Sequence, residues 1–149
     1  MMNEKARLEE LPYEECLEHL REGRVGRLAV VQDGFPHVLP VNYRLVEASH
    51  RTWIAIRTRP GNIIDQAVLQ VAFEIDDIDT GRQRGWSVLA RGTLHHVDVD
   101  AAEFRDRFDP EPWILEERDA WLAIDPFAIT GRRLDPPEQE WAFDALGYL

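Results

Sequence analysis

Apolar positions near the start of the chain recur at helical spacing. Cys16, Leu17 and Leu20 fall on one face of a helix that the pattern predicts over residues 12–22. The proline at position 12 suits a first helical turn, and the glycine at position 23 suits a helix end. On that apolar face, Cys16 is expected to be a small core residue rather than a reactive thiol.

From residue 25 onwards, the pattern changes to the alternation and the enrichment in β-formers that are typical of strands. Asp33-Gly34 is a strong hairpin signal between the first two strands. Polar residues 47–51 predict a turn, and residues 80–85 predict a loop. Short helices are predicted over residues 60–69 and 101–108. The predicted strands cover residues 25–32, 36–44, 52–58, 71–75, 86–99 and 121–132.

About six strands in mostly hairpin-like order favour a mainly β fold, a small antiparallel barrel with short flanking helices. The helices are too few for repeated βαβ units, which disfavours a doubly wound sheet. With no internal repeat and no long linker, a single domain is predicted over residues 1–149, with its core at about 11–134. Aromatic residues in the tail, residues 135–149, predict that the tail docks on the barrel or on a partner subunit.

Charge and composition narrow the possible partners. The 149 residues include 17 basic and 28 acidic side chains, a net charge of −11, which argues against nucleic acid and anionic membrane surfaces as partners. No apolar run approaches the ~18–20 residues of a membrane span, and no signal-peptide pattern is visible. A cytoplasmic protein is therefore expected. The single cysteine excludes an intramolecular disulfide and a Cys-cluster metal site.

Most motifs that carry chemistry are missing from the sequence. The glycines form no dinucleotide-binding fingerprint or phosphate loop, and no serine lies in a nucleophile elbow. His95 and His96 are adjacent on a predicted strand, so they point to opposite faces and make a poor metal pair. Only one basic residue is a lysine, Lys5, so arginine side chains and backbone N–H groups are expected to hold any bound anion.

The most suggestive local feature lies between a predicted strand and a predicted helix, at residues 56–62. Arg57 and Arg59 supply guanidinium groups suited to a phosphate, and Thr58 supplies a hydroxyl. Gly61 allows close approach of the backbone, and free N–H groups at a helix start favour an anion. This segment is therefore a candidate anion site. The alternative is a solvated strand end followed by an ordinary helix cap.

Six stretches in a fixed order across residues 11–134 carry a resemblance to a known family. They are Gly26-Arg27-Leu28-Ala29-Val30-Val31 with Asp33-Gly34 and Pro36; Pro40-Val41-Asn42-Tyr43; Arg57-Thr58 with Pro60-Gly61; Val71-Ala72-Phe73-Glu74; Gly85-Trp86-Ser87-Val88 with Gly92; and Pro126 with Ile129-Thr130-Gly131-Arg132-Arg133. Together they resemble the pyridoxamine phosphate oxidase-like superfamily, the FMN-binding split barrels. The short chain is more similar to the small actinobacterial-type members and the nitroimidazole-resistance proteins than to the vitamin-synthesis enzymes.

This resemblance implies a six-stranded antiparallel split β-barrel and a homodimer, with FMN in a cleft between the subunits. Residues 39–43 would follow the flavin ring and ribityl chain, largely through backbone groups. Arg57 and Thr58 would hold the phosphate, and Trp86 and Ser87 would approach the ring. The implied cofactor-binding residues are Leu39, Pro40, Val41, Asn42, Tyr43, Arg57, Thr58, Arg59, Gly61, Asn62, Trp86, Ser87 and Arg133.

The sequence departs from the family pattern in two places. The family commonly has a lysine at the phosphate soon after the Arg-Thr pair, where this chain has Asn62-Ile63-Ile64. Loss of such a contact costs about 1.5–3 kcal/mol, roughly ten- to over a hundredfold in affinity, unless Arg59 replaces it. The vitamin-synthesis enzymes also close with an arginine, histidine and aspartate cluster, where Arg133-Leu134-Asp135 stands here. Oxidation of pyridoxamine phosphate itself is therefore not expected.

The leading hypothesis is a flavin-dependent oxidoreductase that acts on a small-molecule redox substrate. In such a protein the flavin carries the hydride or electrons, so no side chain has to be a catalytic acid or base. A deazaflavin is an alternative cofactor, because the departure at Ile63 leaves the choice open. A non-enzymatic protein of the same fold that binds a flavin or haem is another alternative, and a purely structural domain without flavin affinity is a third.

Overall fold

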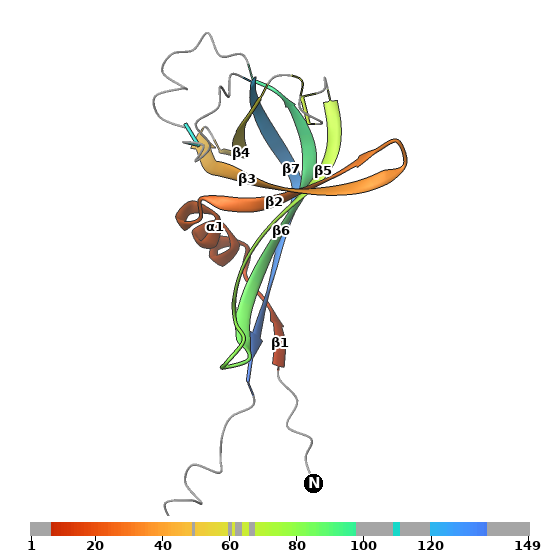
Figure 1. Ribbon diagram of the computed structural model, residues 1–149. Helices are drawn as coiled ribbons and strands as arrows, with labels where there is room; N and C mark the ends of the chain where they lie inside the picture. Colours follow the sequence, from red (N-terminus) through yellow and green to blue (C-terminus); the bar gives the residue numbers. More distant parts are fainter. Residues whose placement is uncertain are drawn as a thin grey trace, which may run out of the picture.

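The computed structural model describes residues 7–48, 50–59, 61, 64–65, 68–97, 109–110 and 120–136. In these segments the chain forms seven strands and a single helix, drawn in Figure 1. The mainly β fold expected from the sequence is confirmed. In chain order the elements are β1 (Arg7–Glu10), α1 (Tyr13–Glu22), β2 (Val25–Gln32), β3 (Phe35–Ala48), β4 (Arg51–Thr58), β5 (Val68–Asp79), β6 (Arg84–His96) and β7 (Ala120–Asp135).

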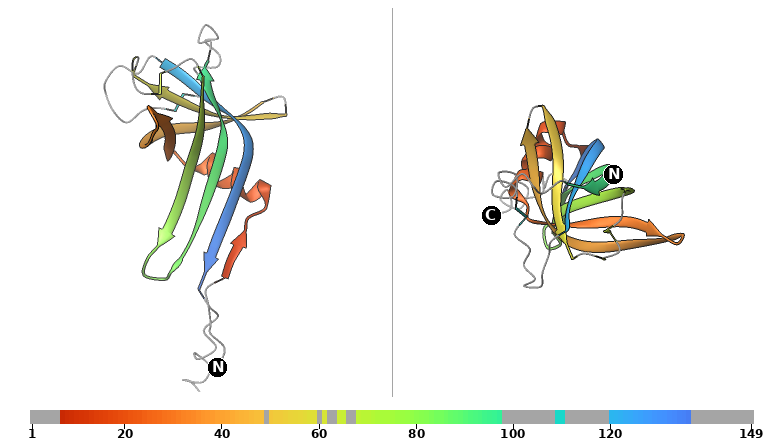
Figure 2. Two further views of the ribbon diagram at one scale, coloured as in Figure 1. Left: turned by 90° about the vertical axis from the view of Figure 1, so that its right-hand side faces the viewer. Right: turned by 90° about the horizontal axis from the view of Figure 1, so that it is seen from above.

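Six of the strands close into an antiparallel ring in the order β7-β4-β3-β2-β5-β6, because β6 also pairs with β7. Seen from above, the strands surround a common interior (Figure 2). The predicted six-stranded antiparallel barrel is thus confirmed. The seventh strand, β1, pairs with the last residues of β7 and was not predicted. All four of its residues are exposed, so it has no alternating apolar pattern to reveal it.

The strand pairings within the ring differ in length, and this difference gives the barrel its split form. β2 and β5 pair over only three residues of each strand, 27–29 and 72–74. β5 and β6 pair over their whole lengths, and β6 and β7 pair from Gly85↔Leu134 to His96↔Leu122. The β5–β6 hairpin, β7 and β1 therefore extend well beyond the ring, as Figures 1 and 2 show.

Helix α1 packs against this extension and contributes to the core. Cys16, Leu17 and Leu20 are buried, as their helical spacing predicted. Burial raises the pKa of the Cys16 thiol above its ordinary value. Gly131 of β7 faces the helix, where an added Cβ would lie 2.7 Å from the Cys16 sulfur. Fully buried side chains of the ring complete the core: Leu28, Tyr43, Ile54, Ile56, Phe73, Val88, Leu94, Leu122 and Ile124.

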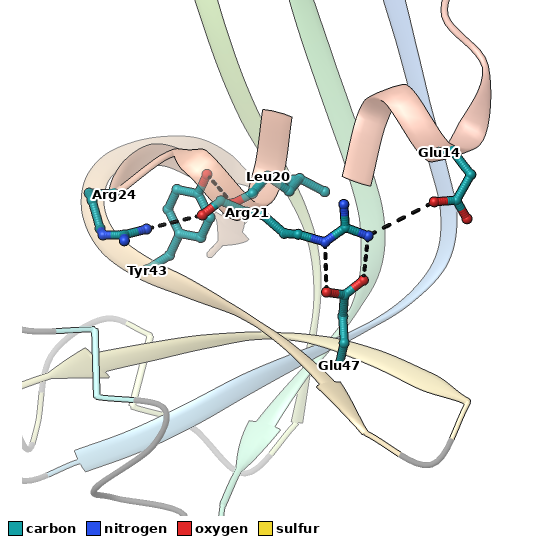
Figure 3. Close-up of polar contacts among 6 residues, drawn as sticks. All are labelled: Glu14, Leu20, Arg21, Arg24, Tyr43 and Glu47. Carbon is teal, nitrogen blue, oxygen red and sulfur yellow. Dashed lines mark hydrogen bonds and ion pairs between the residues drawn. The ribbon is translucent and has the colours of Figure 1, made fainter. Parts of the chain in front are cut away.

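The C-terminal end of α1 is fastened to β3 by polar contacts (Figure 3). The Tyr43 hydroxyl donates a hydrogen bond of 2.9 Å to the carbonyl of Leu20. The Arg24 guanidinium donates one of 3.1 Å to the carbonyl of Arg21. The Arg21 side chain donates two, of 2.8 and 2.9 Å, to the Glu47 carboxylate. The Tyr43 and Arg24 donors satisfy carbonyls that a helix end leaves without intrahelical partners. The Arg21–Glu47 pair fixes the helix to β3.

The predicted helix over residues 60–69 is wrong at its end. Val68 and Leu69 belong to β5, where they pair with His95 and Leu94 of β6. Of the other described residues in that range, Gly61 and Ile64 lie in turns. The apolar spacing suits a helix and a strand equally, and pairing with β6 decides between them. Residues 60, 62–63 and 66–67, the predicted helix at 101–108 and the tail beyond residue 136 lie outside the described residues.

Two strand ends also differ from the prediction. The polar residues 47–51 do not all form a turn, because β3 continues to Ala48 and β4 begins at Arg51. β5 continues through the acidic residues 76–79, which pair with residues 84–87 of β6. Within the described part of the chain, no helix has the length and apolar character needed to cross a membrane.

Candidate functional site

The predicted anion segment lies where β3 and β4 cease to pair. Their register ends at Tyr43↔Ile56, although β3 includes residues 35–42 as well and β4 continues to Thr58. Residues 35–42 pair with β2, and Arg57 and Thr58 pair with β7. We call this place, where β3 and β4 cease to pair, the opening between the two strands. This opening is the candidate functional site.

Arg57 projects at this opening and is half-buried. Its Nη1 atom lies 3.0 Å from both carboxylate oxygens of Asp109, and its Cζ atom lies 4.8 Å from the centre of the Trp121 ring. Trp121 is also the cross-strand neighbour of Arg57 in β7. The indole face and the carboxylate hold the guanidinium in one orientation. The predicted phosphate-binding arginine thus contacts a carboxylate of its own chain.

The other residues of the anion segment differ in accessibility. The Thr58 side chain is only 3% exposed, whereas Arg59 is exposed. Gly61 adopts a φ of +80°, which favours glycine, and its N–H donates a 2.7 Å hydrogen bond to the Asp65 carboxylate. This N–H group is therefore not free, contrary to the prediction of an open helix start. Asn62 lies outside the described residues.

Residues 39–43 lie on β3, at the point where its pairing with β4 begins. Leu39 and Val41 pack against the core, and Pro40 is exposed. The Asn42 amide donates a 3.4 Å hydrogen bond to the carbonyl of Arg24, and the Tyr43 side chain is buried. Side chains of this stretch mostly stabilise the barrel. This arrangement suits the expectation that residues 39–43 contact a ligand mainly through their backbone.

A second group of predicted residues lies on the extension of the barrel. The Trp86 ring stacks on His19 of α1, with ring centroids 3.6 Å apart and planes inclined by 15°. Trp86 and Ser87 also line a surface pocket of about 490 Å³ together with Ile78 and Leu134. One aromatic face of this group is therefore covered by α1, and the pocket offers a largely apolar surface to a planar ligand.

Arg133, the remaining predicted residue, is surrounded by carboxylates. Its guanidinium lies 2.8 Å from Glu15, 3.4 Å from Asp135 and 3.7 Å from Glu9. These neighbours, Glu15 foremost, raise the pKa of Arg133 above its ordinary value. Because Glu9 lies in β1 and Glu15 in α1, Arg133 joins three elements. In this structure the side chain has a clear structural use.

The two groups of predicted residues lie far apart along the sheet. Arg57 pairs with Trp121 of β7, and Ser87 pairs with Arg132, eleven positions further along the same strand. At ~3.3 Å per residue, this separation is at most about 36 Å of strand. The structure thus places Arg57 and Thr58 directly after Ile56, the pairing partner of Tyr43. It places Trp86, Ser87 and Arg133 in a separate group.

Sequence reasoning did not identify the carboxylates of the site. Asp65 lies within the helix predicted over residues 60–69, and Asp109 directly follows the one predicted over residues 101–108. His96 also belongs to the site, since its Nε2 atom lies 3.0 Å from the Asp65 carboxylate. Local signals could not have revealed these contacts, because 52 residues separate Arg57 from Asp109. Among the residues that the structure describes, no cluster of three or more potential ligands could hold a metal ion.

Comparisons with known proteins agree with this architecture. The family model described as pyridoxamine 5′-phosphate oxidase matches residues 12–133. An uncharacterized protein of Mycobacterium tuberculosis is 30% identical in an alignment of 132 residues that covers 84% of this chain and 84% of that protein. A provisionally assigned pyridoxamine 5′-phosphate oxidase from Corynebacterium glutamicum has a TM-score of 0.72 and 30% identity, covering 89% of this chain and 96% of that one. The FAD binding protein of Mycobacterium smegmatis has a TM-score of 0.63 and 27% identity, covering 85% and 98%.

Proposed function

The chain belongs to the pyridoxamine 5′-phosphate oxidase family, and from this membership we propose that it binds a flavin nucleotide, FMN in the first place, as a flavin-dependent oxidoreductase. The observation that carries the proposal is the likeness to the FAD binding protein of Mycobacterium smegmatis, which extends over 85% of this chain. FMN and FAD share the ribityl chain and its phosphate, so the same site can be tested with either.

The residues at the opening between β3 and β4 fit such a ligand in two respects. Residues 39–41 lie just before the first β3–β4 pair, and we propose that their backbone polar groups contact the ribityl chain and the polar edge of the ring. The half-buried Arg57 guanidinium suits a phosphate, because guanidinium groups bind phosphate and carboxylate in similar geometries. This guanidinium already contacts one anionic group, the Asp109 carboxylate.

When bound, the flavin would supply hydride or electron transfer to a small-molecule substrate. The residues described here would hold the ligand: Arg57 at its phosphate and the β3 backbone along its length. Trp86 and Ser87 would border the ring and shield it from water. This division of work requires no acid or base from the protein.

We propose further that the protein is a homodimer with the flavin between subunits. Two observations support this proposal. The Arg57 group and the Trp86 group lie eleven to twelve positions apart along β7, and the Trp86 group lines a surface pocket. A second copy could bring its Trp86 group against the Arg57 group of the first. The site would then be complete only in the dimer.

A titration of the purified chain with FMN and FAD tests the proposed function. We expect saturable binding, followed by absorbance and flavin fluorescence, and a roughly ten- to hundredfold weaker affinity in Arg57→Ala from the loss of one charge-assisted contact. Arg51→Ala is a matched control, because Arg51 lies on the same strand and also contacts a carboxylate and a tryptophan ring. Its affinity should equal that of the unmodified protein.

Binding alone does not show redox activity, so the loaded protein is then mixed with NADPH or NADH under anaerobic conditions. Bleaching of the flavin absorbance and its return with an electron acceptor are expected for an oxidoreductase. Binding without reduction would instead favour a carrier or sensor. Absence of FMN and FAD binding, with deazaflavin or haemin bound, would replace the proposed cofactor, and absence of all four would contradict the flavin proposal.

A further inference from the structure

We propose that the Asp109 carboxylate is an internal competitor at the anion site, so that a ligand phosphate reaches Arg57 only by displacing it. Asp109 would then set the affinity of the site for phosphorylated ligands. This inference rests on the proposed function, in which Arg57 is the phosphate-binding residue.

The geometry of the pair is that of an occupied anion site. Arg57 Nη1 lies 3.0 Å from each oxygen of the Asp109 carboxylate. A carboxylate and a phosphate present similarly spaced, negatively charged oxygens to a guanidinium, so each can take the place of the other. The Trp121 ring, 4.8 Å from Arg57 Cζ, restricts the guanidinium from turning to a different partner.

The partial exposure of the Arg57 and Asp109 side chains allows a phosphate to replace the carboxylate. The side chains of Arg57 and Asp109 are 19% and 35% exposed, so solvent and ligands reach the carboxylate more readily than the guanidinium. A fully buried pair would resist opening because each charge would lose its partner without gaining water. Here the displaced carboxylate can be hydrated while a phosphate takes its place.

The candidate site holds a second carboxylate, Asp65, whose contacts differ from those of Asp109. Asp65 accepts the Gly61 N–H at 2.7 Å and lies 3.0 Å from His96, and its side chain is only 16% exposed. It therefore shapes the turn at Gly61 and is held from two sides. Asp109 is the more exposed of the two carboxylates, and we assign the competition to Asp109 alone.

Strand β4 supplies a matched pair for comparison. Arg51 lies 3.4 Å from the Asp125 carboxylate, and its Cζ atom lies 5.4 Å from the Trp53 ring centre. Both residue pairs thus combine arginine, aspartate and tryptophan. The Arg51 pair lies near the turn between β3 and β4, at the opposite end of β4 from Arg57, and its arginine is 62% exposed. Asp125→Asn removes the same charge as Asp109→Asn without touching the candidate site.

The test compares FMN with riboflavin, which lacks the phosphate, in the unmodified chain, Asp109→Asn and Asp125→Asn. Asparagine keeps the size of the side chain and removes its charge. We expect Asp109→Asn to bind FMN about tenfold more tightly and riboflavin unchanged, and Asp125→Asn to match the unmodified chain for both ligands. Asp109→Ser serves as a second neutral variant, because a thermal melt could show that the asparagine variant does not fold.

Each outcome is decisive. FMN affinity that rises in Asp109→Asn, with no change for riboflavin, supports the competition. If the unmodified chain binds FMN and both neutral Asp109 variants bind it equally or more weakly, the competition is refuted while flavin binding stands. An equal gain for riboflavin also refutes it, because the phosphate would not be involved. If no variant binds FMN or FAD, the proposed function and this inference fail together.

Discussion

Tyr43 illustrates how one side chain can decide the position of a helix. Its ring is fully buried and meets Phe73 edge-on, with centroids 4.9 Å apart. Its hydroxyl reaches the Leu20 carbonyl at 2.9 Å, and Gly23 leaves room for it, since an added Cβ there would lie 2.0 Å from the hydroxyl oxygen. The same residue thus packs in the barrel and caps α1.

Replacement of Tyr43 by phenylalanine should destabilise the fold without disrupting it. The ring and its contact with Phe73 stay, whereas the Leu20 carbonyl loses its donor in a buried position. We expect a loss of about 1–2 kcal/mol in the free energy of unfolding, the usual effect of one buried unsatisfied carbonyl. Urea denaturation measures it, and a free energy equal to that of the unmodified chain would mean that water replaces the hydroxyl.

The same hydroxyl predicts a loss of stability in alkaline solution. Burial raises the pKa of Tyr43 well above its ordinary value. Above about pH 10, a tyrosine in the unfolded chain releases its proton while folded Tyr43 keeps it. The unfolded state then binds fewer protons, so the free energy of unfolding falls as the pH rises. Denaturation at pH 9 to 11 should show a steeper fall for the unmodified chain than for Tyr43→Phe, and parallel curves would contradict this account.

For single residues, the sequence predicted which side chains are buried better than it predicted which residues they contact. The helical spacing of Cys16 correctly indicated a core residue. The contact of residues 39–43 with a flavin through their backbone stays a prediction, whereas the hydrogen bond of Tyr43 to Leu20, 23 residues away, was not predicted. The contact between Asp109 and Arg57 was not predicted either, because the two residues are also far apart in the sequence. Pairings over such distances depend on the docking of whole elements and leave no local pattern.

The docking of α1 depends on the small residue opposite it in β7. An added Cβ on Gly131 would lie 2.7 Å from Cys16 Sγ, 3.0 Å from a Leu11 methyl and 3.1 Å from the Ser87 carbonyl oxygen. No positive φ is required at Gly131, so the glycine is needed for space rather than for backbone conformation. Helix and sheet can therefore approach closely at this point.

Gly131→Ala should destabilise the protein by about 1–3 kcal/mol through overpacking. Cys16→Ala removes the nearest clashing atom, so the double variant should lose less stability than the sum of the two single variants. Urea denaturation of all four proteins measures the coupling. Additive losses would show that the helix is free to move away from β7.

For helices and strands, the sequence predicted the middle of each element better than its ends. The predicted helix at 12–22 and the strand at 25–32 agree closely with α1 and β2. The ends of β3 and β5 extend into polar residues, since backbone pairing with a neighbour continues where the apolar pattern stops. The helix predicted up to residue 69 was wrong because the partner strand, which turns residues 68–69 into strand, lies 25 residues further along the chain.

For the whole molecule, the separation of the two residue groups makes a sharp prediction about the dimer. In the proposed arrangement, Arg57 of one subunit and Trp86 of the other share a flavin. A heterodimer of Arg57→Ala and Trp86→Ala subunits then combines both defects in one site and leaves the other site intact. If both residues acted within one subunit, each site would carry a defect.

Differently tagged Arg57→Ala and Trp86→Ala chains, purified together as a heterodimer, should therefore recover a single tight FMN site per dimer. Each variant homodimer should have none. Stoichiometric titration measures this difference, and thermal melts check that Trp86→Ala keeps its fold despite losing the stack on His19. No recovery in the heterodimer, or sedimentation of the unmodified chain as a monomer at micromolar concentration, would contradict the shared site.

Strand β7 pairs with β1, β4 and β6, and this has a consequence for how the chain folds. Its partners include Arg7, which pairs with Asp135, and Thr58, which pairs with Ala120. Such separations slow folding, because large loops must close before these contacts form. While the ribosome is still synthesising β7, β4 and β6 present bare edges to other nascent chains. We therefore expect a chaperone to bind the nascent chain before residue 120 emerges from the ribosome. The chaperone would be released once β7 has paired with β4 and β6 and closed the ring.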